Sequence, residues 1–299
     1  MKLKYKQPED MATALDCAIR DKENLEAGYI MHKSDTQYWN YMSNEEWKKY
    51  YGKINKKHKS QYGMGAGGEL KAGQYPPKMA SFGSSSRLIY ELSKGTEGFI
   101  FEERLDTRVG GIANLDGLLH KGNKYIYVEA KRREIYGASH ERQEIKSIYL
   151  PVYEKLKNSQ FSYKSEDIEV TNKQEETKRV TFYVNGKPVK YFDLKQLICH
   201  FLGITYDIAK HSVKNAKVLF LYLLYNPQEV EDKIDPKFQK KISDRYNEVK
   251  SFIVDNRDLF KSIFDAVLQY QTETHKLEIP EIDFDFKLVD QYNYGKELN

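Results

Sequence analysis

Two carboxylates and a lysine lie close together in the sequence, on the two sides of a short turn: Asp116, Glu129 and Lys131. The apolar segments 114–119 and 124–131 around them predict two adjacent β-strands joined by the turn 120–123. Successive strand residues point to opposite faces, so Glu129 and Lys131 share a face, and the turn brings Asp116 up beside them. Two carboxylates and a lysine at a strand end can hold a divalent metal and activate a water.

The spacing of an acid and a lysine two residues apart is not specific by itself. It recurs elsewhere in the chain, for example at Glu46 and Glu248. Most of those copies lie in polar or helical runs, where residues i and i+2 do not share a face. The copy at Glu129 differs because it ends an apolar strand and follows a second strand that carries an aspartate. The context, and not the tripeptide, indicates a site.

The bulk composition limits the class of protein. The chain has 299 residues, 31% of them charged, and a net charge of +4, which permits a nucleic-acid partner without arguing for one. Its two cysteines, Cys17 and Cys199, predict neither a disulfide framework nor a zinc site. There is no apolar signal segment and no apolar run of membrane-spanning length, so we expect a cytoplasmic protein. Without internal repeats or a clear linker, residues 1–299 are interpreted as one domain.

Local patterns predict the elements that must position the three residues. Ser84 is a helix N-cap, Asn185-Gly186 is a hairpin turn, and the apolar run 217–225 is typical of a strand buried on both faces. The remaining predicted elements are helices within 7–26 and after Ser43, a helix over 84–93, a strand over 99–105, a helix over 139–157, a loop over 158–178, a hairpin over 180–191, a helix from Asp193 to Gly203, a helical segment over 237–271 broken near 255–257, and an edge strand within 279–294.

This order of helix, three strands, helix and apolar strand resembles the PD-(D/E)xK nuclease superfamily, which shares the core of type II restriction endonucleases. The resemblance covers roughly residues 79–225. Five short segments are also similar to a restriction-endonuclease-like bacterial group: 67–71, 76–79, 84–86, 111–116 and 196–203. The resemblance implies an α/β restriction-endonuclease-like core over about 79–226, with a mixed central β-sheet flanked by helices. Residues 1–78 and 227–299 are then helical N- and C-terminal additions.

Carried over to this chain, the resemblance makes Asp116 and Glu129 the metal-binding carboxylates and Lys131 the lysine near the attacking water. Members of the superfamily often add a catalytic glutamate from the helix before the first strand, and Glu91 fits that position best. The family often has proline before its aspartate, whereas Leu115 precedes Asp116 here. Three further glutamates remain alternatives for the additional carboxylate: Glu69, Glu102 and Glu103.

The resemblance implies a Mg²⁺-dependent endonuclease, with Mn²⁺ as a possible substitute, that cuts double-stranded DNA as a restriction enzyme and forms a homodimer. Two alternatives remain open. One is a catalytically inactive DNA-binding or interaction module on the same fold, although the three intact residues argue against it. The other is a nuclease of DNA repair or of a mobile element, which the sequence does not distinguish from a restriction enzyme.

Basic and turn segments are the candidates for DNA contacts. The lysine-rich, aromatic segment 48–59 and the hairpin at Asn185-Gly186 are two of them. Arg132 and Arg133 extend the positive charge beyond Lys131, and we expect them either to contact the DNA backbone or to end the strand in solvent.

Overall fold

The computed structural model describes residues 8–30, 37–64, 68–71, 76–167 and 177–299. A mixed five-stranded sheet lies at the centre, in the order β11-β10-β5-β4-β3. β3, β4 and β5 pair antiparallel, and β10 pairs parallel with both β5 and β11. Their bounds are Ile100–Asp106 for β3, Ile112–Lys121 for β4, Lys124–Lys131 for β5, Ala216–Leu224 for β10 and Ile282–Val289 for β11.

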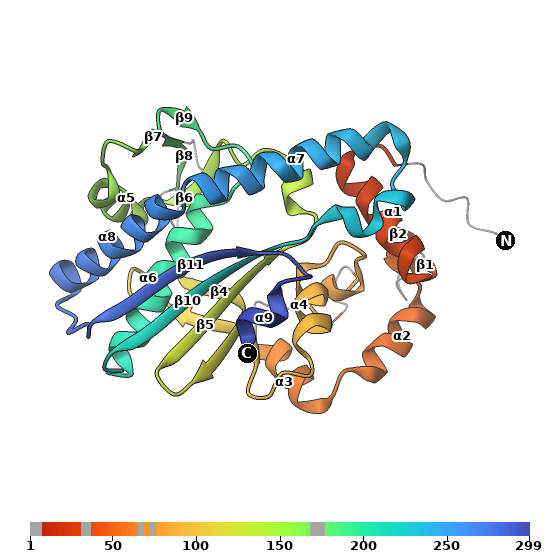
Figure 1. Ribbon diagram of the computed structural model, residues 1–299, viewed down its shortest axis with the longest axis horizontal. Helices are drawn as coiled ribbons and strands as arrows, with labels where there is room; N and C mark the ends of the chain where they lie inside the picture. The colour runs from red at the N-terminus through yellow and green to blue at the C-terminus, as the bar shows by residue number, and fades with distance from the viewer. Residues whose placement is uncertain (1–7, 31–36, 65–67, 72–75, 168–176) are drawn as a thin grey trace.

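Helices surround this sheet, and two smaller sheets lie at its ends (Figure 1). The helices are α1 (Met11–Glu23), α2 (Asn44–Lys53), α3 (Lys56–Met64), α4 (Ser85–Ser93), α5 (Leu150–Leu156), α6 (Leu194–Lys210), α7 (Pro236–Asp255), α8 (Arg257–His275) and α9 (Tyr294–Leu298), with 3₁₀ turns at Lys78–Ala80, Glu134–Tyr136, Ser147–Tyr149 and Pro227–Lys233. One small sheet contains β1 (Ala27–Ile30) and β2 (Gln37–Met42); the other contains β6 (Gln143–Lys146), β7 (Phe161–Asp167), β8 (Thr177–Val184) and β9 (Lys187–Pro188).

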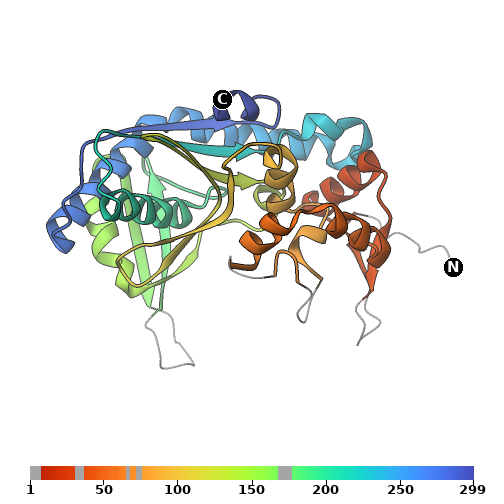
Figure 2. The ribbon, with the colours of Figure 1, turned by 90° about the horizontal axis from the view of Figure 1, so that it is seen from below.

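Figure 2 shows how the two ends are arranged. Seen from below, α5 and the β6–β9 sheet lie at one end of the central sheet, and the elements from α1 to α3 lie at the other. Both ends extend toward the same side of the molecule, while α7, α8 and β11 lie on the opposite side. The prediction of an α/β fold with a mixed central sheet flanked by helices is confirmed. No helix in the described ranges is long and apolar enough to cross a bilayer.

The strands that form the centre of the sheet are those with the longest apolar runs. Every residue of β10 except Lys217 is buried. The strands β5 and β11 pair with its two edges, and helices cover its two faces. In β5 all residues between the two terminal lysines are buried. The predicted edge strand is β11, and the predicted break near 255–257 separates α7 from α8. The predicted hairpin turn also forms, with Asn185 and Gly186 both at positive φ.

Two predictions in the middle of the chain are wrong. Residues 139–157 are not one helix, because β6 occupies 143–146 and only 150–156 are α-helical. Part of the predicted loop 158–178 is the strand β7, which pairs with β8 along its whole length. Buried Phe161 and Tyr163 alternate with exposed residues, and pairing with a distant strand stabilises this polar segment. The rest of that predicted loop, 168–176, lies outside the described residues.

The helix predicted to end at Gly203 continues to Lys210. A Cβ added at Gly203 would lie 2.8 Å from the Cβ atoms of both Leu105 and Ala113. The glycine therefore serves the close approach of α6 to β3 and β4, and it does not end the helix.

The N-terminal elements were only partly predicted. α1 ends at Glu23, with Asn24 in the left-handed conformation, and α2 starts after its Ser43 N-cap as expected. The β1–β2 hairpin was not predicted, because it lacks a clean apolar alternation. Of the segment 67–71, Gly67 lies outside the described residues.

Candidate functional site

Asp116 and Glu129 lie on neighbouring strands where the β4–β5 ladder opens. The last backbone pair of that ladder joins Gly117 to Val128, which puts Asp116 opposite Glu129. Asp116 Oδ2 accepts a 2.7 Å hydrogen bond from the backbone N–H of Ala130. The aspartate side chain therefore replaces a rung of the ladder, and the backbone of the strand that carries Glu129 holds the Asp116 carboxylate.

Lys131 is held beside Glu129 by two acceptors. Its Nζ donates to Glu129 Oε1 at 2.6 Å and to Gln196 Oε1 at 2.7 Å. His200 Nε2 lies 3.0 Å from Glu129 Oε2, at ion-pair distance, although neither ring nitrogen has a well-directed hydrogen bond. Gln196 and His200 are four residues apart in α6 and therefore share a helix face, which lies over the end of β5.

Burial and neighbouring charge set the protonation of this group. Burial raises the pKa of Asp116 well above its ordinary value, and the charges of Glu129 and Glu102 raise it further. Burial also acts to raise the pKa of Glu129, but Lys131 and His200 outweigh it and hold that pKa at about 2. Burial acts to lower the pKa of Lys131, but Glu129 outweighs it and the pKa lies well above the ordinary value. Glu129 and Lys131 form a charged pair, whereas Asp116 has no cation of its own, and its raised pKa favours the protonated form when no cation is bound.

Glu102 joins the group through an unusual backbone conformation. The residue pairs on either side of it in the β3–β4 ladder place Glu102 opposite Asp116. The backbone angle φ of Glu102 is 57°. A non-glycine residue in this region is strained, and such strain is concentrated at functional sites. Glu102 Oε1 accepts a 3.1 Å hydrogen bond from Ser86 at the start of α4. Burial, and then the charge of Glu69, raises the pKa of Glu102 to about 7.

Glu69 brings a fourth carboxylate near the strands. It is 2% exposed, and its Oε1 accepts a 2.9 Å hydrogen bond from Lys78. Its Oε2 is buried without a hydrogen-bond partner. We refer to the four acids and the lysine that pairs with one of them as the carboxylate cluster: Glu69, Glu102, Asp116, Glu129 and Lys131.

The other two glutamates proposed from the sequence are not in this cluster. Glu91 is 43% exposed at its side chain and forms an ion pair with Lys94 one turn further along α4. Burial raises the pKa of Glu103, and the next cause is the charge of Asp207 in α6, away from Asp116. The structure brings together Asp116, Glu129 and Lys131, and it brings Glu102 and Glu69, not Glu91, to their side.

Whether the cluster fits a metal depends on its donor chemistry. Within the described ranges, no group of three or more His, Cys, Asp or Glu side chains is arranged to hold a metal ion. The donors are nevertheless carboxylate oxygens, the ligands that Mg²⁺ prefers. The unpartnered oxygen of Glu69 and the repulsion around Asp116 are both features that a cation would relieve. We therefore regard the donor set as compatible with a divalent cation held by Asp116 and Glu129.

Arg132 and Arg133 do not have the positions expected from the sequence. Arg132 is 5% exposed, and Glu23 of α1 accepts hydrogen bonds from both Arg132 and Arg87, at 2.9 and 2.7 Å. Arg133 donates to Asp16 at 2.6 Å. Arg132 is thus neither a solvated strand end nor available to DNA, because α1 covers it. These five residues form a second buried ionic group, which we call the arginine network.

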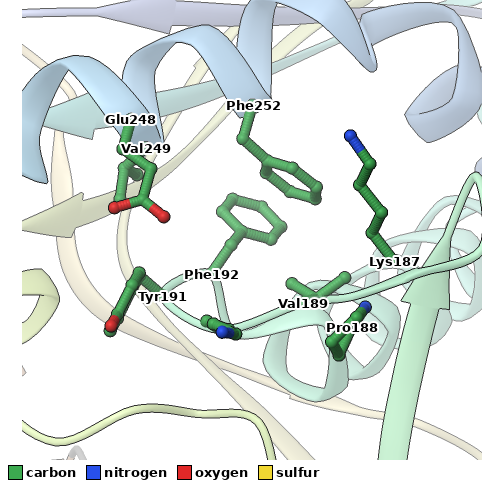
Figure 3. A pocket seen from close by; sticks show the side chains of 9 residues that line it. Lys187, Pro188, Val189, Tyr191, Phe192, Glu248, Val249 and Phe252 are labelled. Carbon is green, nitrogen blue, oxygen red and sulfur yellow. The ribbon is translucent and has the colours of Figure 1, made fainter.

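A separate apolar cavity of about 330 Å³ lies between the segment 187–192 and α7. In Figure 3 the rings of Phe192 and Phe252 lie next to each other at this cavity, and their centroids are 5.5 Å apart. No member of the carboxylate cluster lines this cavity. It therefore lies outside the candidate site.

Sequence reasoning missed the contributions of Ser86, Gln196 and His200. Gln196 and His200 could have been found as a polar pair at i and i+4 in an otherwise apolar helix. Ser86 gave no signal, because it reads as part of the N-terminal turn of α4.

Comparisons with known proteins give this site no relative: no family model matches the sequence, and no curated protein or solved structure shows significant similarity to the chain.

Proposed function

We propose that this protein is a metal-dependent phosphodiesterase that cleaves DNA, with Asp116, Glu129 and Lys131 as its catalytic residues. One observation carries the proposal: buried Glu129 and half-buried Asp116 converge from adjacent strands, and only Glu129 is paired with a lysine. Structural ion pairs normally match their charges, whereas this group holds more carboxylates than cations, and a bound cation would favour the ionised form of Asp116.

The side chains have distinct roles in this chemistry. A divalent cation held by Asp116 and Glu129 would polarise the phosphoryl oxygen and lower the pKa of a bound water. Lys131, held by Glu129 and Gln196, would place positive charge near the phosphoryl oxygens, on which negative charge develops during attack. The Ala130 N–H fixes the direction of the Asp116 carboxylate.

The proposal that DNA is the substrate rests on exposed positive charge and on the resemblance to the nuclease superfamily. Exposed lysines of α2 and α3, such as Lys53 and Lys57, form a basic flank on the N-terminal side of the molecule. Such a flank neutralises a phosphate backbone without reading its sequence. A restriction role, Mg²⁺ as the physiological ion and a homodimer follow from the family resemblance stated for the sequence.

The second candidate is a binding module without catalysis. The engagement of Lys131 by two acceptors favours it, because only one of the three ammonium N–H groups is left for a water or a phosphate. The first candidate explains the unpaired Asp116 and the strained Glu102, and the second does not.

The test is cleavage of supercoiled, unmethylated phage DNA with Mg²⁺ or with EDTA, by the wild type and by Glu129→Gln. A matched control is Glu248→Gln, because Glu248 has the same spacing to a lysine but lies 57% exposed on α7. We expect discrete bands that require Mg²⁺, disappear with Glu129→Gln and persist with Glu248→Gln.

Other results separate the alternatives. A smear of products would indicate a repair or non-specific nuclease in place of a restriction enzyme. Tight DNA binding without cleavage would establish the binding module. Wild-type cleavage by Glu129→Gln would remove the proposed site.

A further inference from the structure

A cavity of about 480 Å³ lies between α6, the start of β4 and the β6–α5 segment. This volume is within the range of small-molecule sites, roughly 300–1,000 Å³. Gln196 and His200 line it, and these are the residues that contact Lys131 and Glu129. Asn114 also lines it, on the same face of β4 as Asp116. The cavity therefore adjoins the carboxylate cluster through shared walls.

Two polar groups in this cavity lack partners within the protein. The Oδ1 atom of Asn114 and the Nδ1 atom of His200 are buried without a hydrogen bond, whereas His200 Nε2 lies 3.0 Å from Glu129 Oε2; His200 itself is only 2% exposed. Buried polar atoms in folded proteins are nearly always satisfied, and leaving them unpaired costs about 1–3 kcal/mol each. These atoms supply acceptor and donor capacity to a ligand that enters the cavity.

The remaining walls combine an aromatic ring with charged side chains of both signs. Tyr149 presents a half-buried aromatic ring, and Lys146 and Lys195 add positive charge. Glu144 and Asp193 also line the cavity, so its charge is mixed. An aromatic ring can stack on the base of a nucleotide, and lysines can neutralise the phosphate of the nucleotide.

We propose that this cavity binds one nucleotide, with its base toward Asn114 and His200 and its phosphate toward the lysines. The inference rests on the proposed function for its link to cleavage, but not for the binding itself. The nucleotide is either an unstacked nucleotide of the DNA being cut or a free nucleoside monophosphate, because both carry the same groups. In the first case the cavity fixes the strand beside the carboxylate cluster and contributes to site selection.

Cys199 provides a direct measurement of occupancy. It lines the cavity, whereas Cys17 lies on α1 and serves as an internal reference. The experiment measures the rate at which N-ethylmaleimide alkylates each of the two thiols. Peptide mass spectrometry gives the two rates separately, and EDTA is present throughout. The probes are dAMP, dGMP, dCMP and dTMP, with inorganic phosphate and deoxyribose 5-phosphate as controls.

We expect at least one nucleotide to slow alkylation of Cys199 and not of Cys17. At about ten times its Kd, the ligand should slow the reaction about tenfold by mass action. Phosphate and the sugar phosphate, which lack the base, should not. If no nucleotide protects Cys199, or if phosphate alone protects it equally, the proposal is overturned.

Matched lysine variants of the same helix sharpen the result. Lys195→Glu should weaken protection by about tenfold, because it reverses a charge that lines the cavity. Lys210→Glu, at the exposed end of α6, should leave protection unchanged. Equal protection in both variants would contradict the proposed position of the phosphate.

A fluorescence experiment distinguishes the two sources of the nucleotide. It uses a DNA fragment that the protein cleaves, in which 2-aminopurine replaces one adenine at a time. A rise in fluorescence on binding in EDTA, at a position beside the cut, identifies an unstacked nucleotide of the substrate. Protection by mononucleotides without this rise identifies a free nucleotide. Because alkylation does not depend on cleavage, a protein that binds nucleotides but cuts no DNA would refute the proposed function and leave this site intact.

Discussion

Two buried ionic groups meet at the end of β5, and they differ in how their charges are matched. The carboxylate cluster contains Lys131, and the arginine network contains the next two residues, Arg132 and Arg133. In the network, two acids face three arginines. In the cluster, four acids face Lys131 and the largely exposed Lys78.

The two buried aspartates express this difference. Burial raises the pKa of Asp16 to about 6, and every charge near it, from Arg133, Arg132 and Arg87, acts to lower it. Burial also raises the pKa of Asp116, but there the charges with the largest effect, Glu129 and Glu102, raise it further, and Lys131 lowers it less. Burial alone therefore does not identify a functional group. The sign of the surrounding charges distinguishes the two groups. Cations surround the aspartate of a structural network, whereas further acids surround the aspartate of a cation site.

The largest expected effect comes from Asp116→Asn. The amide oxygen can still accept the Ala130 N–H, but the charge is lost, so cleavage should fall about 10³-fold or more. Folding should not suffer. The pKa of Asp116 is raised in the folded protein, so the aspartate lowers stability at pH values above its ordinary pKa, a cost that a neutral amide does not carry.

Plasmid cleavage and urea unfolding at pH 7 test this prediction together. A variant that loses both cleavage and stability would show that Asp116 is a structural residue, like those of the arginine network.

Glu23→Gln tests the other side of the comparison. It leaves the buried Arg87 and Arg132 without their shared carboxylate, so the free energy of unfolding should fall by about 3 kcal/mol, the lower end of the range for buried pairs, because the Glu23 side chain is 34% exposed. The matched variant Glu273→Gln breaks an exposed ion pair with Lys155, and its free energy of unfolding should stay close to that of the wild type. Both are measured by urea unfolding. Similar losses in the two variants would mean that the network contributes no more than a surface pair.

The contribution of Asp16 to the free energy of unfolding should depend on pH, because its pKa is raised in the folded protein. The folded protein keeps this proton up to about pH 6, whereas an unfolded aspartate releases it near 3.8. Stability should therefore fall as pH rises through this window, by roughly 3 kcal/mol from this residue. Asp16→Asn should flatten the wild-type curve between those pH values in unfolding experiments. Parallel curves for the two proteins would be inconsistent with a buried, protonated Asp16.

The smallest effect is expected from Glu91→Gln. Its ion pair with Lys94 is exposed, so the free energy of unfolding should change by less than about 0.5 kcal/mol. Cleavage should remain at the wild-type level in the plasmid assay, because Glu91 lies outside the carboxylate cluster. A large loss of cleavage would instead support the role that the sequence resemblance gave to it.

The strand pair that positions the candidate site was predictable from the sequence, because it depends on local signals. Alternation in 124–131 placed Glu129 and Lys131 on one face, and the short turn placed Asp116 beside them. The mixed sheet was predictable for a related reason, since the almost wholly apolar β10 had to be covered on both faces.

The rest of the site depends on contacts between distant segments. Glu102 joins the cluster because its φ is positive, and no residue type near it signals that conformation. Gly203 was misread as a helix end because its role, close packing against Leu105, is visible only once α6 lies on the sheet. Glu91 was chosen over Glu69 because position in a helix can be predicted, whereas the direction in which an extended loop residue points cannot.

The hydrogen bond from Ala130 to Asp116 has a consequence for motion. The two carboxylates are attached to adjacent strands that share a rung, so their separation changes only if the sheet itself deforms. Gln196 and His200 belong to a different element. A small shift of α6 would thus release or tighten Lys131 while the carboxylates stay in place, which makes the helix the adjustable part of the site and the sheet its fixed frame.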